Sequence, residues 1–394
     1  MAARSVNTVV VGLGAMGSAT AYQLAKRGAS VVGLDRYAPP HTHGSTHGET
    51  RVTRTAIGEG EEYTPFALRS HELWREIERE TGTDLLTLTG GLIISSSSAQ
   101  AEVHVPGFLS TTIAAARRYE IPHEVLDAAE IRRRYPPFRV ADEETGYFEP
   151  GAGFVRPERS VAAQLLLAQR HGANLRLGEE ALEVRPEGAG AVVRTGAAEY
   201  RAEQVVLTAG PWLPELLAPE YARHFSVTRQ VLYWFAARDS IEPFLPDRFP
   251  IFIWEPAGLP EAIYGFPAID GAAGGVKIAP GTYGERVDPD EVQRAVTDAE
   301  IAAMYRLVEP CFPGIGPRCL KAATCLYTVT ADAGFVIDRH PEHSQIVLVS
   351  PCSGHGFKHS AAIGEAVAEW VTEGKSRLDL TPFALGRLER PAVS

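Results

Sequence analysis

The amino-acid sequence predicts an α/β protein in which a nucleotide-binding domain of discontinuous segments is interrupted by an inserted, β-rich α+β substrate domain. Two observations indicate this fold: a strand–glycine turn–helix–strand unit at residues 9–36, and a β-rich block at residues 227–279 between two α/β regions. At 394 residues the chain is too long for one ordinary core, so two domains are expected. We expect the nucleotide-binding domain to comprise residues 1–90, 150–220 and 320–394, and the substrate domain residues 91–149 and 221–319.

The N-terminal unit has the pattern of a Rossmann-like dinucleotide-binding motif. A short run of valines, typical of a strand buried on both faces, leads into G-x-G-x-x-G at Gly12, Gly14 and Gly17. A helix-forming stretch follows, and a second apolar run ends at Asp35. Gly12 permits the tight turn, Gly14 lets backbone N–H groups approach a pyrophosphate, and Gly17 lets the helix pack closely on the strand. The helix N-terminus then stabilises the phosphate charge.

The acid at the end of this unit bears on the identity of the dinucleotide. Asp35 lies at about the 20-residue spacing expected for a carboxylate that binds ribose, which favours FAD or NAD over NADP. Arg36 follows it, and because an arginine near this position accommodates a 2′-phosphate in NADP-binding proteins, NADP stays open here. The choice between FAD and NAD depends on residues further along the chain.

The rest of the chain alternates between helical and strand-like patterns. Helices are predicted at residues 65–80, 158–171, 288–307 and 357–372, and residues 110–135 are expected to be helical with a short strand between. Strands are predicted at residues 85–95, 174–177, 191–194, 204–207, 322–328, 334–338 and 345–349. Residues 37–54 are rich in Pro, Gly and His and are predicted to form a loop.

Composition and charge exclude several functional classes. The net charge of −11 gives no basic surface for nucleic acid, and no apolar run approaches 18 residues, so no membrane span is expected. The first strand begins almost at the N-terminus, which leaves no room for a signal peptide. The four cysteines contain no C-x-x-C pair, so neither a metal site nor a disulfide framework is indicated. We therefore expect a cytoplasmic protein without a bound metal.

Four further motifs follow the N-terminal unit in order: GSTHGETRVTR at residues 44–54, YGFP at 264–267, TCLYT at 324–328 and CSGHGFKHS at 352–360. Together they resemble the monomeric sarcosine oxidase and N-methyltryptophan oxidase family of flavin amine oxidases, over nearly the whole chain. The resemblance implies a Rossmann-like FAD-binding domain, a fold like that of D-amino-acid and glycine oxidases, and a monomer. It implies an oxidase that converts a secondary (N-methyl, N-alkyl or cyclic) α-amino acid and O₂ into an imine and hydrogen peroxide.

The same resemblance assigns cofactor contacts. Cys325, in C-x-Y spacing, matches the position that carries a covalent thioether to the flavin 8α-methyl group, whereas a free cysteine alone would usually be a small buried hydrophobic residue. The glycine-rich segment before the last helix is suited to an isoalloxazine ring that becomes anionic on reduction. The remaining cofactor contacts that it implies are Arg36, Ser45, Gly354, His355, Gly356, Phe357 and Lys358.

Active-site residues are implied in the same way. Arg54 and Lys358 match the pair that binds the substrate carboxylate, and an arginine fork with a lysine point charge suits one carboxylate. Lys277 matches a lysine implicated in oxygen activation, since a cation near the flavin stabilises superoxide. The other residues implied near the flavin and the substrate are His47, Arg51, Tyr264 and Tyr327.

Departures from the family pattern bear on the substrate. The family has two consecutive histidines where this chain has Thr46 and His47, and it often has a histidine where Gly281 stands. Loss of that imidazole is expected to open volume, and Phe252 and Trp254 are expected to reshape the apolar wall. A bulkier or cyclic amino acid is thus as well suited as sarcosine. A flavin dehydrogenase that uses another electron acceptor, an NAD-dependent dehydrogenase and a non-catalytic nucleotide-binding protein remain alternatives.

Overall fold

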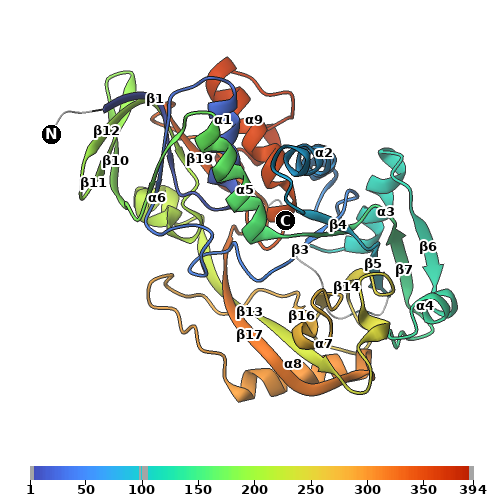
Figure 1. Ribbon diagram of the computed structural model, residues 1–394. Helices are drawn as coiled ribbons and strands as arrows, with labels where there is room; N and C mark the ends of the chain where they lie inside the picture. Colours follow the sequence, from blue (N-terminus) through green and yellow to red (C-terminus); the bar gives the residue numbers. More distant parts are fainter. Residues whose placement is uncertain (1–3, 97–98, 100–104, 390–394) are drawn as a thin grey trace.

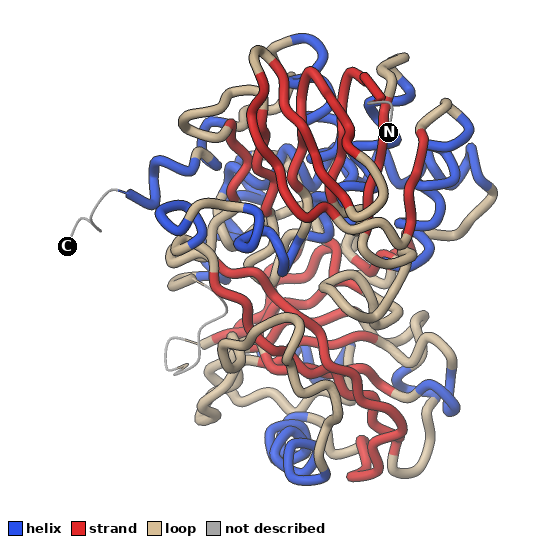
Figure 2. Tube along the Cα trace, turned by 90° about the vertical axis from the view of Figure 1, so that its left-hand side faces the viewer, coloured by secondary structure: helices blue, strands red, loops and turns tan. Residues whose placement is uncertain are grey.

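The computed structural model describes residues 4–96, 99 and 105–389, and arranges them in two lobes, each built on one large sheet (Figures 1 and 2). The sheet of the first lobe has eight strands. Its parallel centre is β9-β2-β1-β12-β19, and β10, β11 and β18 add antiparallel strands. The strands are β1 (Arg4–Val11), β2 (Val31–Asp35), β9 (Asn174–Leu177), β10 (Ala181–Glu187), β11 (Gly190–Thr195), β12 (Glu199–Leu207), β18 (Val336–Arg339) and β19 (Ile346–Ser350).

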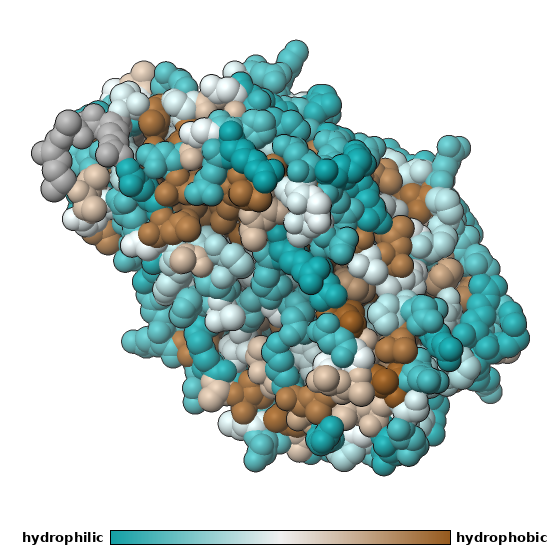
Figure 3. Space-filling view, viewed as in Figure 1, coloured by the Kyte–Doolittle hydropathy of each residue, from teal (hydrophilic) through white to brown (hydrophobic). Residues whose placement is uncertain are grey.

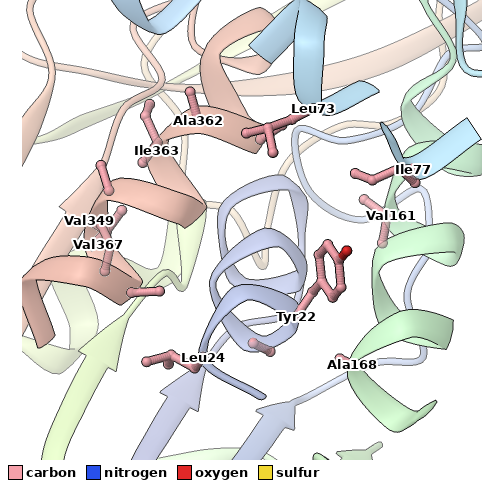
Figure 4. Packing of buried hydrophobic residues seen from close by; sticks show 14 of the residues in the cluster. Tyr22, Leu24, Leu73, Ile77, Val161, Ala168, Val349, Ala362, Ile363 and Val367 are labelled. Carbon is pink, nitrogen blue, oxygen red and sulfur yellow. The ribbon is translucent and has the colours of Figure 1, made fainter. Parts of the chain in front are cut away.

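Helix α1 (Ala15–Lys26) is the centre of the core in this lobe, and it is buried continuously from Gly17 to Ala25. It packs between α5 (Pro157–Arg170) and α9 (Ser360–Glu373), and α2 (Thr64–Thr81) covers α9 (Figure 1). Figure 4 shows Tyr22 of α1 facing α5, with apolar residues of α9 on the other side. Because a helix buried all round tolerates little change of volume, Leu24→Ala is expected to cost about 2–5 kcal/mol.

The second lobe contains a mixed eight-stranded sheet of order β17-β13-β16-β15-β14-β5-β7-β6. Helix α8 packs on β17, and α3 and α4 pack at the other end of the sheet. A small sheet of order β3-β8-β4 joins the lobes. The elements are β3 (Arg51–Thr53), β4 (Leu86–Leu88), β5 (Gly91–Ser95), α3 (Phe108–Arg118), β6 (Glu124–Asp127), α4 (Ala128–Arg134), β7 (Thr145–Glu149), β8 (Gly153–Val155), α6 (Pro219–Ala222), β13 (Ser226–Ala237), β14 (Ile251–Trp254), β15 (Ile263–Phe266), α7 (Gly271–Gly274), β16 (Val276–Pro280), α8 (Asp298–Cys311) and β17 (Ile315–Val329).

Most predicted elements are confirmed, but the helix predicted at residues 288–307 is wrong in its first half. Helix α8 begins only at Asp298, because Thr297 and Glu300 form a capping box that fixes its N-terminus. The carbonyl groups of Gln293 and Ala295 instead accept hydrogen bonds from Arg229 on β13. Side chains of another element therefore replace the helical hydrogen bonds of this segment.

Two other expectations need correction. The loop predicted at residues 37–54 contains β3, which pairs with β8. The strand predicted at residues 85–95 is divided between two sheets as β4 and β5, and β10 was not predicted. Strand β17 pairs with β13 along its length, and it runs through residue 320, where a domain boundary is expected. The domain boundaries stay a prediction.

The surface agrees with the composition. Hydrophilic residues dominate the face seen in Figure 3, and the hydrophobic patches on it are interrupted by polar side chains. Within the described residues, no helix is both long enough and apolar enough to cross a membrane.

Candidate cofactor and active site

A cavity lies in the first lobe at the carboxyl ends of the parallel strands β1, β2, β12 and β19. Ligands of open α/β sheets bind at this edge, outside the carboxyl ends of the strands. The 41–46 loop, the segment after β12 and the 351–357 segment complete the wall. The predicted site residues that line it are Gly12, Gly14, Asp35, Arg36, Ser45, Arg51, Tyr327, Gly354, Gly356 and Phe357.

The three glycines of the N-terminal motif have separate structural reasons. Gly12 has φ +91°, and a Cβ there would lie 2.5 Å from the carbonyl oxygen of Thr208. A Cβ at Gly17 would lie 1.7 Å from the carbonyl oxygen of Gly12, so helix and turn could not pack. A Cβ at Gly14 would meet only the Thr46 hydroxyl, at 3.5 Å. Gly14 lines the cavity and immediately precedes α1. This open backbone at a helix N-terminus fits a pyrophosphate.

The end of the cavity at Asp35 is acidic. Asp35 is buried and its carboxylate accepts two backbone N–H groups, at 2.7 and 2.8 Å. Arg36 is engaged by Glu180 at 3.4 Å and Asp290 at 3.2 Å, and its guanidinium lies 5.0 Å from the Trp212 ring centroid. Because both acids hold Arg36, it is poorly placed to receive a 2′-phosphate. The geometry therefore favours an unphosphorylated ribose.

At the other end of the cavity, Arg51 joins the 41–46 loop to Cys325. Its Nη2 donates to the carbonyl oxygen of Ser45 at 2.8 Å and lies 3.5 Å from Sγ of the fully buried Cys325. The hydroxyl groups of Tyr264 and Tyr327 lie 3.1 Å apart, and burial raises the pKa of both. Since Arg51 and Tyr327 line the cavity, Cys325 and Tyr264 lie directly behind its wall.

Lys277 is buried in the same region, on β16. Its Nζ donates to the carbonyl oxygens of Gly48 and Thr50 at 2.7 and 2.9 Å, and lies 3.1 Å from the Thr50 hydroxyl. Burial and the neighbouring Arg51 lower the pKa of Lys277. His47 precedes this loop; burial, followed by the charge of Arg51, lowers its pKa to about 3, so its imidazole is neutral at physiological pH.

Arg54 and Lys358 come together around one carboxylate. Glu59 accepts from Arg54 at 2.7 Å and lies 3.7 Å from Nζ of Lys358, with all three side chains at most 5% exposed. The second Arg54 nitrogen donates to the carbonyl oxygen of Ala56 at 2.6 Å, and Lys358 donates to that of His355 at 2.7 Å. Burial lowers the pKa of Lys358 to about 8, although Glu59 opposes the shift. Two cations thus converge on the carboxylate of Glu59.

Several predicted residues do not lie where the sequence analysis expected them. His355 does not line the cavity; it turns inward, stacks on Phe335 and lies 2.9 Å from the carbonyl oxygen of Ala333. Phe252 and Trp254 do not shape the wall near Tyr264, because they project from the opposite face of the sheet into the core beneath α8. A Cβ at Gly281 would lie 3.1 Å from that of Ala262, so the space next to this position is already filled.

Two acids of the site were not predicted from the sequence. Glu59 lies five residues after Arg54 in the same loop, and this nearby opposite charge was the available signal. Glu158, in the first turn of α5, accepts the backbone N–H groups of Gly48 and Glu49 at 2.7 and 3.0 Å. No local pattern connects Glu158 to that loop, because the two are about a hundred residues apart.

Among the described residues, the side chains that could hold a metal ion together are His340, Glu342 and His343 on the turn between β18 and β19. Their ligand atoms lie within 4.8 Å of one another, and the two imidazole rings are stacked with centroids 4.9 Å apart. The lone pair of an imidazole nitrogen lies in the plane of its ring. Two nearly parallel rings therefore do not point their lone pairs at one ion, so this arrangement is a poor metal site. It does not line the cavity.

Comparison with known proteins decides the family. Residues 7–370 match the model of the FAD dependent oxidoreductase family. The chain belongs to this family. It is 42% identical over 384 residues to a monomeric sarcosine oxidase of Streptomyces avermitilis, covering 97% of each chain. It is 34% identical over 386 residues to an N-methyl-L-tryptophan oxidase of Escherichia coli, covering 97% of this chain and 99% of the relative.

Solved structures of amino acid oxidases share the fold. NikD, an unusual amino acid oxidase essential for nikkomycin biosynthesis, superposes with a TM-score of 0.81 at 26% identity over 97% of each chain. Glycine oxidase from Geobacillus kaustophilus gives a TM-score of 0.76 at 21% identity, covering 97% of this chain and 98% of that one. The predicted Rossmann-like FAD-binding fold and the family resemblance are thereby confirmed. The protein is an FAD-dependent oxidoreductase, and the NAD-dependent alternative is excluded.

Proposed function

We propose that the protein is an oxidase of a secondary α-amino acid (N-methyl, N-alkyl or cyclic) that releases an imine and hydrogen peroxide. The observation that carries the proposal is the convergence of Arg54 and Lys358 on one buried carboxylate. The names of the relatives point the same way, since sarcosine and N-methyl-L-tryptophan are both N-methyl amino acids. FAD, when bound, supplies the hydride acceptor and returns the electrons to O₂.

Glu59 marks where the substrate carboxylate would bind. Its carboxylate has the chemistry of the substrate group, and the fork of Arg54 with the point charge of Lys358 would hold either one. A substrate must therefore displace Glu59 from Arg54. This exchange replaces one charge-assisted hydrogen bond by another, so that substrate binding leaves neither cation without a counter-charge.

Tyr264 and Tyr327 would orient the rest of the substrate. Their paired hydroxyl groups form a polar point beside the cavity, and the raised pKa of both keeps them neutral. His47 is neutral, so the positive charges on this side of the site are those of Arg51 and Lys277. A cation beside a substrate amine lowers the pKa of that amine. Arg51 and Lys277 would therefore favour the unprotonated amine needed for oxidation.

The position of Cys325 supports a covalent thioether to the flavin 8α-methyl group. The guanidinium of Arg51 lies 3.5 Å from Sγ, so the proposed attachment atom lies next to a residue of the cavity wall. Arg51 also lines the cavity, so the thiol and the cofactor would share this residue.

Lys277 is the candidate for oxygen activation. Its three hydrogen-bond partners suit an ammonium group, and a fixed positive charge in a partly dry site stabilises the negative charge that develops on O₂. We also propose that the protein acts as a monomer, as the name of its sarcosine oxidase relatives suggests.

An oxygen-electrode screen tests the proposed function. The purified flavoprotein is offered sarcosine, larger N-methyl amino acids, proline and pipecolate, each with its decarboxylated amine as a matched control. We expect O₂ uptake and peroxide with at least one amino acid and far less with the matched amine. Flavin reduction by substrate without O₂ uptake would instead select the dehydrogenase alternative.

A further inference from the structure

We infer that Glu158 is a positioning residue for Lys277, and that it holds the ammonium in place through the Gly48–Glu49 peptide group. The inference rests on the proposed function of Lys277 in oxygen activation and adds a residue from a different element, helix α5. Neither the sequence motifs nor the family resemblance had drawn attention to it.

One peptide group lies between the two charges. The carbonyl oxygen of Gly48 accepts from Nζ of Lys277 at 2.7 Å, and the N–H of Glu49, on the same peptide, donates to the Glu158 carboxylate at 3.0 Å. Because the C=O and N–H of a trans peptide point in opposite directions, the negative end of the dipole faces the ammonium and the positive end faces the carboxylate. Such a chain of hydrogen bonds strengthens cooperatively.

Glu158 also stabilises a turn that the chain would otherwise avoid. Gly48 has φ +95° and Glu49 has φ +72°, and a residue with a side chain rarely adopts the second value. Glu158 accepts both of their N–H groups, and Thr50 donates its own N–H to the carbonyl oxygen of Gly48 at 2.8 Å. The turn directs the Gly48 and Thr50 carbonyl groups toward Lys277.

The charges around the lysine give Glu158 a second effect. Burial and the Arg51 guanidinium lower the pKa of Lys277, and Cys325, Glu158 and Glu49, in decreasing order, raise it. Glu49 is itself paired with Lys321 on β17, whereas Glu158 accepts the N–H groups of the turn that binds Lys277. Other titratable groups near Lys277 and its loop are Cys325 on β17, the neutral His47, and Arg156, whose charge interacts with both Glu49 and Glu158.

The surroundings of Glu158 favour its ionised carboxylate. Burial raises the pKa of Glu158. The two backbone N–H groups and the Arg51 charge lower it by more, so the pKa lies below its ordinary value. Its position in the first turn of α5 also places the carboxylate at the positive end of a helix dipole. The lowered pKa of Glu158 favours its ionised form.

The test is a double-mutant cycle on the FAD-loaded enzyme, with Glu158→Gln, Lys277→Met and both changes together. Arg159→Ala, at the exposed next residue of α5, is the matched control. Stopped-flow measurements give the rate of flavin reduction by substrate without O₂, and the rate of reoxidation by O₂ over the neutral and alkaline pH range. Flavin content and visible spectrum establish that each variant carries its cofactor.

We expect Glu158→Gln to slow reoxidation about tenfold, the change that one pKa unit represents, while reduction changes little. Reoxidation should fall off at a lower pH than in the wild type, because loss of the acid lowers the pKa of Lys277. In the Lys277→Met background Glu158→Gln should add nothing, since it acts through the missing ammonium.

Two results would overturn the inference and leave the function of Lys277 intact. In the first, Glu158→Gln reoxidises at the wild-type rate although Lys277→Met reoxidises slowly. In the second, Glu158→Gln slows reoxidation by the same factor whether residue 277 is lysine or methionine. A wild-type reoxidation rate in Lys277→Met would refute the oxygen role of the lysine itself, and the inference with it.

Discussion

Glu59 occupies the site that we assign to the substrate carboxylate, so removing its charge should tighten carboxylate binding. Its carboxylate is 2.7 Å from Arg54, and both side chains are at most 3% exposed. A hydrogen bond to a charged group contributes about 1.5–3 kcal/mol, so Glu59→Gln should lower the Kd of a carboxylate ligand by roughly one to two decades. Without ligand, the same change leaves two buried cations poorly compensated, at a cost of about 3–5 kcal/mol in stability.

The assay combines a binding titration with thermal unfolding. Methoxyacetate is a suitable ligand, because it has the shape of sarcosine but no amine to titrate. The measurement belongs at mildly acidic pH, well below the pKa of about 8 of Lys358 in the wild type, because loss of Glu59 lowers that pKa further. We expect Glu59→Gln to have a lower Tm without ligand and a larger rise in Tm on binding. Glu62→Gln, at an exposed acid of the same segment, should match the wild type. Wild-type or weaker binding by Glu59→Gln would refute the exchange.

Three further predictions follow from the site. The denatured wild-type protein should exceed its sequence mass by one flavin, and Cys325→Ser should lose this increment; an increment retained in the variant would assign the attachment elsewhere. Lys277→Met should slow flavin reoxidation by O₂ far more than reduction by substrate, and equal slowing of both half-reactions would contradict the electrostatic role. The Kd of methoxyacetate should be constant below pH 8 and rise above it, because burial lowers the pKa of Lys358 to about 8 and the charge is lost above that pH; a flat profile would rule out Lys358 as a ligand.

The N-terminal unit was predictable because its geometry is local. Gly17 meets its steric demand at the carbonyl oxygen of Gly12 within the same turn, and the spacing of Asp35 follows from one strand–helix–strand unit. The demand at Gly12 comes from a distant segment, at Thr208. The boundary of α8 was predictable in principle from the capping box at Thr297 and Glu300, which the apolar pattern of residues 288–307 obscured.

The site was only partly predictable, because tertiary contacts decide its charges. Arg54 and Lys358 could be paired only through a family resemblance, since the fold brings together segments about 300 residues apart. Glu59 and Glu158 have no motif of their own, and their roles appear only when the partner atoms are in place. The face of a strand was also misjudged at Trp254, where alternation along β14 directs the side chain into the core.

The central claim is that this flavoprotein oxidises a secondary amino acid and returns the electrons to O₂. The most direct measurement mixes the purified protein with an N-methyl or cyclic amino acid in the absence of O₂, follows the visible flavin absorbance, and then admits O₂. We predict that the absorbance bleaches at a rate that saturates with substrate, and that it returns on mixing with O₂ with one peroxide formed per flavin. A flavin that no secondary amino acid bleaches, or one that stays bleached in the presence of O₂, would contradict the claim.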